Sequence, residues 1–129
     1  MRCVTVTDRD PATQVLTFDL RDLLAVLGPD VARSRWAARD VEALGGTAAT
    51  VLHAVSASGE MLNGERLIEL ALQVDQIIDG EFSGYLADEA RPWAIIRAVD
   101  SSAYDICCDL PEVLSAIRLR FSQVDDVSE

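Results

Sequence analysis

The chain has 129 residues, half of them hydrophobic, which is enough to bury the core of one domain without disulfide or metal staples. Its formal net charge of −11 argues against binding to a nucleic-acid backbone, which requires clustered cations. No apolar run approaches the length of about 18 residues that suggests a membrane helix, and residues 1–7 lack the apolar region of a signal peptide. We therefore expect one cytoplasmic domain over residues 1–129 that binds neither nucleic acid nor membrane.

The negative charge is concentrated in the second half of the chain. Residues 1–59 carry seven acidic side chains against six arginines, whereas residues 60–129 carry fifteen against five. An electrostatic partner of this half should be basic. All eleven cations are arginine, which is typical of GC-rich bacterial coding, so we expect a bacterial protein.

The three cysteines, Cys3, Cys107 and Cys108, do not resemble the disulfide framework of a small secreted domain, because their number is odd and two of them are adjacent. We expect three free thiols in a reducing compartment. The cysteines and His53 show no metal-ligand spacing, and no glycine-rich phosphate loop occurs. The sequence therefore predicts no metal, nucleotide or other cofactor.

Residues 2–7 and 13–18 each alternate between apolar and polar side chains and are separated by a turn-rich stretch, which predicts an amino-terminal hairpin. A short helix should follow, beginning at Asp19 and ending at the Gly28-Pro29 pair. Its apolar positions are Leu20, Leu23, Leu24 and Leu27.

Residues 30–44 fit neither a helix nor a strand well, and the sequence leaves both open. Residues 47–57 predict a short helix. Asn63 is expected to cap the longest helix, which should end before Gly80. Its apolar stripe is Leu67, Leu70, Ala71, Val74, Ile77 and Ile78.

Residues 81–86, 93–99 and 104–108 predict a three-strand meander. Pairing Val99 with Tyr104 and Leu86 with Trp93 defines one apolar face, and a slip of one residue would exchange the two faces. The expected core face is Phe82, Leu86, Trp93, Ile95, Val99, Tyr104, Ile106 and Cys108.

The stretch from Asp109 to Glu112 has the form of a capping box, so a last helix should begin there. Its expected apolar stripe is Leu110, Leu114, Ile117 and Phe121. Residues 123–127 are expected to add an edge strand before an acidic tail that ends at Glu129. The fold class is therefore α+β: an antiparallel sheet, made of the meander at residues 81–108 and the amino-terminal hairpin, with helices packed on one face.

Catalytic chemistry finds little support in the sequence. His53 is the only histidine and lies among alanine and valine, which favours a histidine bound to a local carbonyl over a member of a catalytic triad. Arg97 lies within an apolar run, and we expect it to reach a carboxylate such as Glu81, Asp79 or Asp100.

These observations favour a non-enzymatic protein that binds a basic protein, as small acidic immunity proteins neutralise basic toxins or nucleases. The alternative is a small-ligand-binding or hydrolytic domain with a pocket between the long helix and the sheet. The candidate binding residues are carboxylates near strand ends together with the arginine and aromatic residues of the meander. They are Asp79, Glu81, Tyr85, Trp93, Arg97, Asp100, Tyr104 and Asp105.

Overall fold

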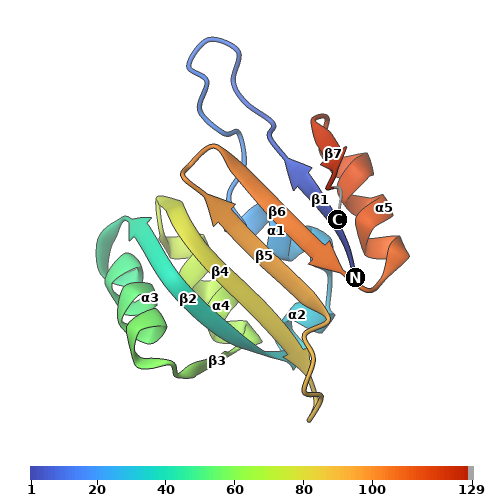
Figure 1. Ribbon diagram of the computed structural model, residues 1–129. Coiled ribbons are helices and arrows are strands. Elements are labelled where there is room, and N and C mark those ends of the chain that lie inside the picture. The colour runs from blue at the N-terminus through green and yellow to red at the C-terminus, as the bar shows by residue number, and fades with distance from the viewer. Residues whose placement is uncertain (128–129) are drawn as a thin grey trace.

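The computed structural model describes residues 1–127 and has the expected α+β class (Figure 1). The described residues form a seven-stranded antiparallel sheet in the order β3-β2-β4-β5-β6-β1-β7. The strands are β1 (Arg2–Val6), β2 (Ser34–Leu44), β3 (Met61–Asn63), β4 (Gln76–Leu86), β5 (Ala94–Val99), β6 (Ala103–Cys108) and β7 (Val124–Asp126).

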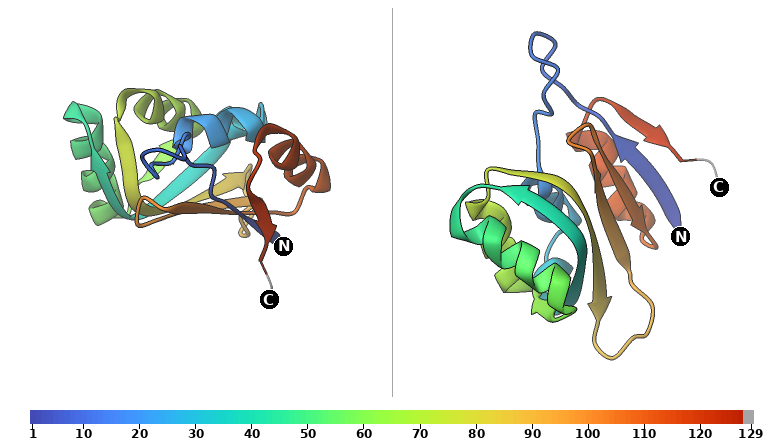
Figure 2. Two further views of the ribbon diagram at one scale, coloured as in Figure 1. Left: turned by 90° about the horizontal axis from the view of Figure 1, so that it is seen from above. Right: turned by 60° about the vertical axis from the view of Figure 1, so that its left-hand side comes forward.

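Among residues 1–127, four helices cover one face of the sheet and none lies over the opposite face (Figure 2). The covering helices are α1 (Leu20–Leu27), α2 (Asp30–Arg33), α4 (Gly64–Gln73) and α5 (Pro111–Arg120), whereas α3 (Gly46–Ser58) flanks β2. The hydrophobic core lies between the sheet and the covering helices, so the prediction of helices on one face is confirmed for these four.

Helix α1 forms as the sequence predicts. The carboxylate of Asp19 accepts a hydrogen bond from Leu20 N at 2.8 Å, and Asp22 completes a capping box at the same helix end. All four leucines of the apolar stripe are buried, and Gly28 ends the helix at φ 90°. The sequence is enough to predict this helix because its apolar stripe and both of its caps lie within ten residues of one another.

The segment that the sequence leaves open, residues 30–44, divides into α2 and the long strand β2. Trp36 lies in β2 and its side chain is fully buried, and its indole N–H donates to Val31 O at 3.0 Å. The alternation of β2 is interrupted at Asp40, which has a φ of 52° at a bulge opposite β4. This bulge explains why the pattern fits neither a regular helix nor a regular strand.

Helix α3 protects the edge of β2 that β3 does not pair. Val41 N donates to Ser56 Oγ at 3.3 Å, and Val41 O accepts from His53 Nδ1 at 3.2 Å. Two side chains of the helix thus take the place of a neighbouring strand. The interpretation of His53 as a histidine bound to a local carbonyl is confirmed.

Helix α4 begins at its Asn63 cap, as predicted, but it is shorter than expected. Arg66 N donates to Asn63 Oδ1 at 2.8 Å, and the helix ends at Gln73 with Val74 as its cap. Ile77 has the spacing of the apolar stripe, but it belongs to strand β4 and is buried there, not on the helix. The prediction that one helix extends to Gly80, and is the longest, is wrong.

The three-strand meander forms, but the pairing of β5 with both neighbouring strands is shifted by one residue from the predicted register. Val99 pairs with Ala103 and Ala98 with Tyr104. Asp100 and Ser101 have positive φ and make a three-residue turn, in which Ser102 N donates to Val99 O at 2.9 Å.

The shifted register exchanges the two faces of β5. Ala94, Ile96 and Ala98 are buried in the core, whereas Ile95, Arg97 and Val99 lie on the uncovered face. The neighbouring strands place Phe82, Tyr104, Ile106 and Cys108 in the core, as predicted.

The predicted amino-terminal hairpin does not form. Residues 13–18 contain no strand, and their only ladder contact is an isolated bridge between Arg9 and Leu16. Strand β1 instead pairs with β6 on one side and with β7 on the other. The expected edge strand near the carboxyl end is confirmed as β7, while Glu129 of the predicted acidic tail lies outside the described residues.

Helix α5 buries Leu114, Ile117 and Phe121, as expected from its stripe. The predicted capping box is wrong, because Leu110 occupies the cap position and no side chain caps the helix. The carboxylate of Asp109 lies instead 3.9 Å from the amino group of Met1.

Candidate functional site

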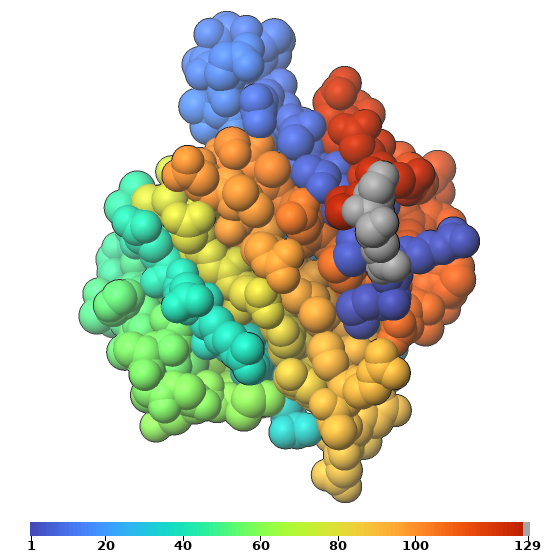
Figure 3. All heavy atoms as spheres, in the orientation of Figure 1, coloured from blue at the N-terminus to red at the C-terminus, as the bar shows by residue number. Residues whose placement is uncertain are grey.

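Four of the predicted site residues, Glu81, Tyr85, Arg97 and Asp105, lie on the uncovered face of the sheet, which faces the viewer in Figure 3. We call this face the open face and define it by the side chains that alternate with buried ones and point away from the helices. They are Cys3, Thr5, Arg35, Ala37, Arg39, Glu81, Ser83, Tyr85, Ile95, Arg97, Val99, Ala103, Asp105 and Cys107.

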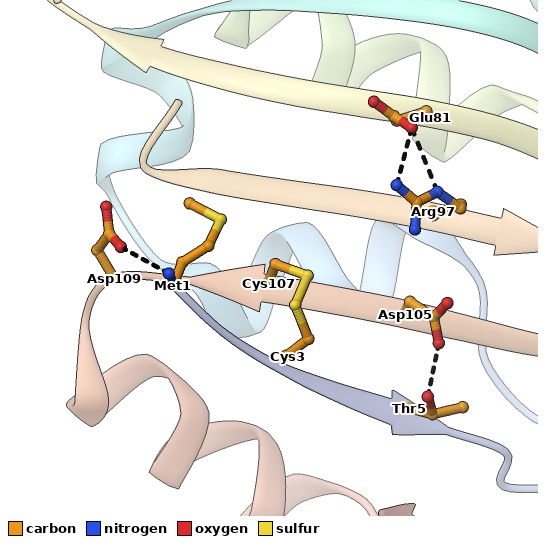
Figure 4. Close-up of a disulfide and its surroundings, with 8 residues drawn as sticks. All are labelled: Met1, Cys3, Thr5, Glu81, Arg97, Asp105, Cys107 and Asp109. Carbon is orange, nitrogen blue, oxygen red and sulfur yellow. Dashed lines mark hydrogen bonds and ion pairs between the residues drawn. A yellow bond between two sulfur atoms is a disulfide. The ribbon is translucent and has the colours of Figure 1, made fainter. Parts of the chain in front are cut away.

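A row of polar side chains crosses the middle of the open face on five strands. Cross-strand pairing places them in the order Arg39, Glu81, Arg97, Asp105 and Thr5, and we call this set the polar row. Glu81 Oε2 accepts from Arg97 Nη2 at 3.0 Å, and Asp105 Oδ1 accepts from Thr5 Oγ1 at 2.6 Å (Figure 4). Charges of opposite sign stand opposite one another, which holds these side chains in defined positions.

The neighbouring row contains smaller and more apolar side chains. It runs through Ala37, Ser83, Ile95, Cys107 and Cys3. Cys107 and Cys3 form a disulfide between β6 and β1, which lies on the open face (Figure 4). The open face is therefore neither uniformly polar nor uniformly apolar, as is typical of protein-binding surfaces.

A group of carboxylates stands at the end of the sheet near the β5–β6 turn. Glu42 pairs with Asp79 across β2 and β4, and Asp100 N donates to Asp79 Oδ1 at 2.8 Å. Asp40 is exposed at the bulge of β2. We call Asp40, Glu42, Asp79 and Asp100 the acidic end; none of the four belongs to an ion pair within residues 1–127.

The structure brings together six of the eight predicted site residues. Glu81, Tyr85, Arg97 and Asp105 lie on the open face, and Asp79 and Asp100 belong to the acidic end. Arg97 binds Glu81, which was one of its three expected partners, although the arginine lies on the open face and not among core side chains.

Trp93 and Tyr104 are buried and cannot contact a partner in this fold. Trp93 is 5% exposed, and its indole N–H donates to Ser34 Oγ at 2.8 Å. Tyr104 is 1% exposed, and its hydroxyl donates to the carboxylate of Asp19. Aromatic residues in a strand resemble binding residues in the sequence, because the sequence does not show which face each one occupies.

Two buried groups, Tyr104 and Cys108, have raised pKa values. Burial raises the pKa of Tyr104 far above the ordinary value, and the nearby charge of Asp19 raises it further. Burial also raises the pKa of the Cys108 thiol. Both groups thus keep their protons in the folded protein at pH values at which an unfolded chain would release them.

We predict that the free energy of unfolding falls as the pH rises past about 8.5, where an unfolded cysteine ionises, and again past about 10, where an unfolded tyrosine ionises. Proton release stabilises only the unfolded chain, so stability is complete below these values and is lost above them. Urea unfolding between pH 7 and 11 measures the effect. Tyr104→Phe should remove the part above pH 10, and an unchanged profile would show that the hydroxyl of Tyr104 is not responsible.

The expectation of three free thiols is wrong. Cys3 and Cys107 form a disulfide, and among the described residues only Cys108 remains free and is buried. The pairing of β1 with β6 places Cys3 directly opposite Cys107, a neighbourhood that spans 104 residues of sequence. Disulfides are most common in oxidising compartments, whereas the cysteine count favours a reducing one, so the inference of a reducing compartment stays a prediction.

Three of the hollows on the surface of residues 1–127 are possible ligand sites. One of 220 Å³ lies beside Asp19 and Tyr104, one of 790 Å³ lies between β1, α5 and β7, and one of 420 Å³ lies beside His53. None of the three is lined by Arg97. The space between α4 and the sheet is filled by Leu67, Leu70, Phe82 and Ile96, all at most 1% exposed, which counts against the alternative of a pocket there.

No group of three or more His, Cys, Asp or Glu side chains within residues 1–127 could hold a metal ion. No helix in that part of the chain is long and apolar enough to cross a membrane. Comparison with protein-family models, curated proteins and solved structures finds no match to this chain.

Proposed function

We propose that this protein is a non-enzymatic binding protein whose partner is a basic protein, and that it binds this partner through the open face and the acidic end. The observation that carries the proposal is that the sheet face without helices presents an ordered row of paired charges and borders on a group of unpaired carboxylates. A surface with fixed side chains of mixed polarity loses little conformational entropy on binding.

The charge distribution specifies the kind of partner. The whole chain has a formal net charge of −11, and four of its carboxylates, those of the acidic end, have no ion-pair partner in the described chain. Such a field attracts basic surfaces and repels acidic ones, including nucleic-acid backbones. The proposed binding function would include neutralisation of a basic toxin or nuclease, because such a partner carries the charge opposite to that of this chain.

The acidic end offers substitutions that remove charge with little effect on the backbone. We would combine Asp40→Asn, Glu42→Gln, Asp79→Asn and Asp100→Asn. Asp40 and Asp100 have φ values of 52° and 49°, and asparagine is among the residues that tolerate this region best. An amide oxygen at position 79 can still accept from Asp100 N, so the tie between β4 and the β5–β6 turn can be kept.

We predict that this quadruple variant associates with the basic partner about tenfold more slowly at low salt, with a smaller change in dissociation. The candidate partners are basic proteins of the native organism, captured at low salt, purified and tested individually by surface plasmon resonance. The matched control is Glu65→Gln, Asp88→Asn, Glu89→Gln and Glu112→Gln, which removes the same charge from exposed positions elsewhere.

Affinity for the partner should fall steeply between about 50 and 500 mM salt, because screening shortens the reach of these charges. The control variant should keep most of the original association rate. A partner whose binding ignores both salt and the quadruple substitution, or one that is equally affected by the control, would contradict the proposal.

A further inference from the structure

Strands β1 and β7 are bound to each other more extensively than their small size suggests, and we call them the edge pair. Beyond their ladder, Thr7 N donates to Gln123 O at 3.0 Å and Val127 N donates to Cys3 O at 3.1 Å. The carboxylate of Asp8 accepts from Ser122 N at 2.9 Å and Gln123 N at 2.6 Å. These bonds join the two ends of the described chain to one another.

The edge pair is attached to the rest of the fold mainly through β1, since β7 pairs only with β1 among the described strands. β1 is joined to β6 by a ladder of five residue pairs, by the bond from Thr5 to Asp105 and by the disulfide. Two ion pairs add to these attachments, one between the amino group of Met1 and Asp109 and one between Arg118 of α5 and Asp126 of β7. After β1 the chain leaves the body of the protein in a projecting loop that returns at α1 (Figure 1). The loop is itself anchored at two places: Arg9 donates to Ser102 O in the β5–β6 turn at 2.5 Å, and Phe18 is buried in the core.

We propose that the disulfide between Cys3 and Cys107 is a reducible tether that decides whether the edge pair can separate from β6 while the rest of the sheet stays folded. Both cysteines lie on the open face, where no helix covers them, and both are only partly buried. A reductant can therefore reach the sulfur atoms without unfolding the core. This inference is independent of what the open face binds.

The reaction is an exchange with a dithiol. A thiolate of the dithiol attacks one sulfur of the pair and forms a mixed disulfide, and the other cysteine leaves as a thiolate that takes up a proton. The second thiol of the reagent then displaces the remaining cysteine, which is also protonated. Two electrons and two protons pass to Cys3 and Cys107, and the dithiol becomes a cyclic disulfide.

Cys108 takes no part in this exchange. It points to the opposite side of β6 from Cys107, and its sulfur accepts from Leu110 N at 3.4 Å. It is buried and its pKa is raised, so it stays a protonated, unreactive thiol while β1 is in place. It is paired in register with Arg2 of β1, so separation of the edge pair would uncover it.

The tether changes which motions are possible. With the disulfide intact, Cys3 cannot move away from Cys107, and the middle of β1 stays on β6. After reduction, separation is still opposed by the β1–β6 ladder, by the bond from Thr5 to Asp105 and by the burial of Val4 and Val6, which are 1% and 0% exposed. The contacts of Met1 with Asp109 and of Arg9 with Ser102 oppose it as well. Opening of the edge pair becomes a local event, which needs less free energy than global unfolding.

The test is hydrogen exchange of the full chain with the disulfide intact and after treatment with dithiothreitol under native conditions. We expect the amides of β1, β7 and the facing side of β6 to exchange about tenfold faster or more after reduction, with β2 and β4 unchanged. Cys3→Ser should exchange like the reduced protein. Cys108→Ser keeps the tether and should exchange like the oxidised protein.

Thiol counting gives a second readout. The oxidised native protein should react with no maleimide, whereas the reduced native protein should react at Cys3 and Cys107 at once and at Cys108 slowly, as β1 opens. Equal acceleration of exchange in all strands would show that reduction loosens the whole fold, and unchanged exchange in β1 and β6 would show that the disulfide restrains nothing. Either result overturns the proposal, as do three free thiols in the protein under oxidising conditions.

Discussion

Replacement of Asp19 by alanine should destabilise the protein by about 3–5 kcal/mol, because one carboxylate satisfies hydrogen-bond donors from three elements. It caps α1 at Leu20 N, accepts from the hydroxyl of the buried Tyr104 on β6, and accepts from Ile77 N on β4 at 3.1 Å. Alanine would remove the cap and leave the tyrosine hydroxyl and the amide without a partner. Chemical unfolding in urea measures the loss.

Two further variants separate these contributions. Asp22→Ala removes only the reciprocal bond of the capping box, from Asp19 N to Asp22 Oδ2 at 2.9 Å, and should cost about 1 kcal/mol. Tyr104→Phe removes the buried hydroxyl, so in the background of Asp19→Ala it should cost less than in the parent protein, or even restore stability. Additive effects of Asp19→Ala and Tyr104→Phe would show that the two side chains do not depend on each other.

The role of Asp19 also shows what could be predicted from the sequence and what could not. Its function as a helix cap follows from the residues after it, and the sequence predicts α1 with both ends. Its bonds to Tyr104 and Ile77 join residues that are 85 and 58 positions apart, and no local pattern indicates them. The disulfide is of the same kind, because it depends on the pairing of β1 with β6 and not on the spacing of cysteines.

The predictions of element boundaries and strand register are wrong where the backbone departs from regular geometry. The bulge at Asp40 interrupts the alternation of β2, so the sequence does not indicate a strand there. The apolar residues Val74 and Ile77 continue the helical spacing of α4 into β4, so the predicted helix is too long. Five of the eight candidate site residues, the four carboxylates and Arg97, could be predicted as surface groups, since carboxylates and arginine are rarely buried without partners. Trp93 and Tyr104 could not, because aromatic residues suit the core and a binding surface equally well.

The exchange of faces in β5 leads to the second large effect. Ile96 is 0% exposed and packs in the core, whereas its neighbour Ile95 lies half-buried on the open face between Ser83 and Cys107. Ile96→Ala should therefore cost about 2–5 kcal/mol, since it removes buried methyl groups and leaves a cavity. Ile95→Ala should cost about 1 kcal/mol or less, since it changes mainly strand preference and contacts on a solvated surface.

The two alanine variants are matched controls for each other, because they make the same chemical change at adjacent positions of one strand. Their midpoints of urea unfolding should differ clearly, with Ile96→Ala the less stable. Ile117→Ala on α5 should resemble Ile96→Ala, because Ile117 is also 0% exposed on the helix side of the sheet. If Ile95→Ala were instead the more destabilising of the pair, β5 would have the register in which Val99 pairs with Tyr104, and Arg97 would lose its place beside Glu81 on the open face.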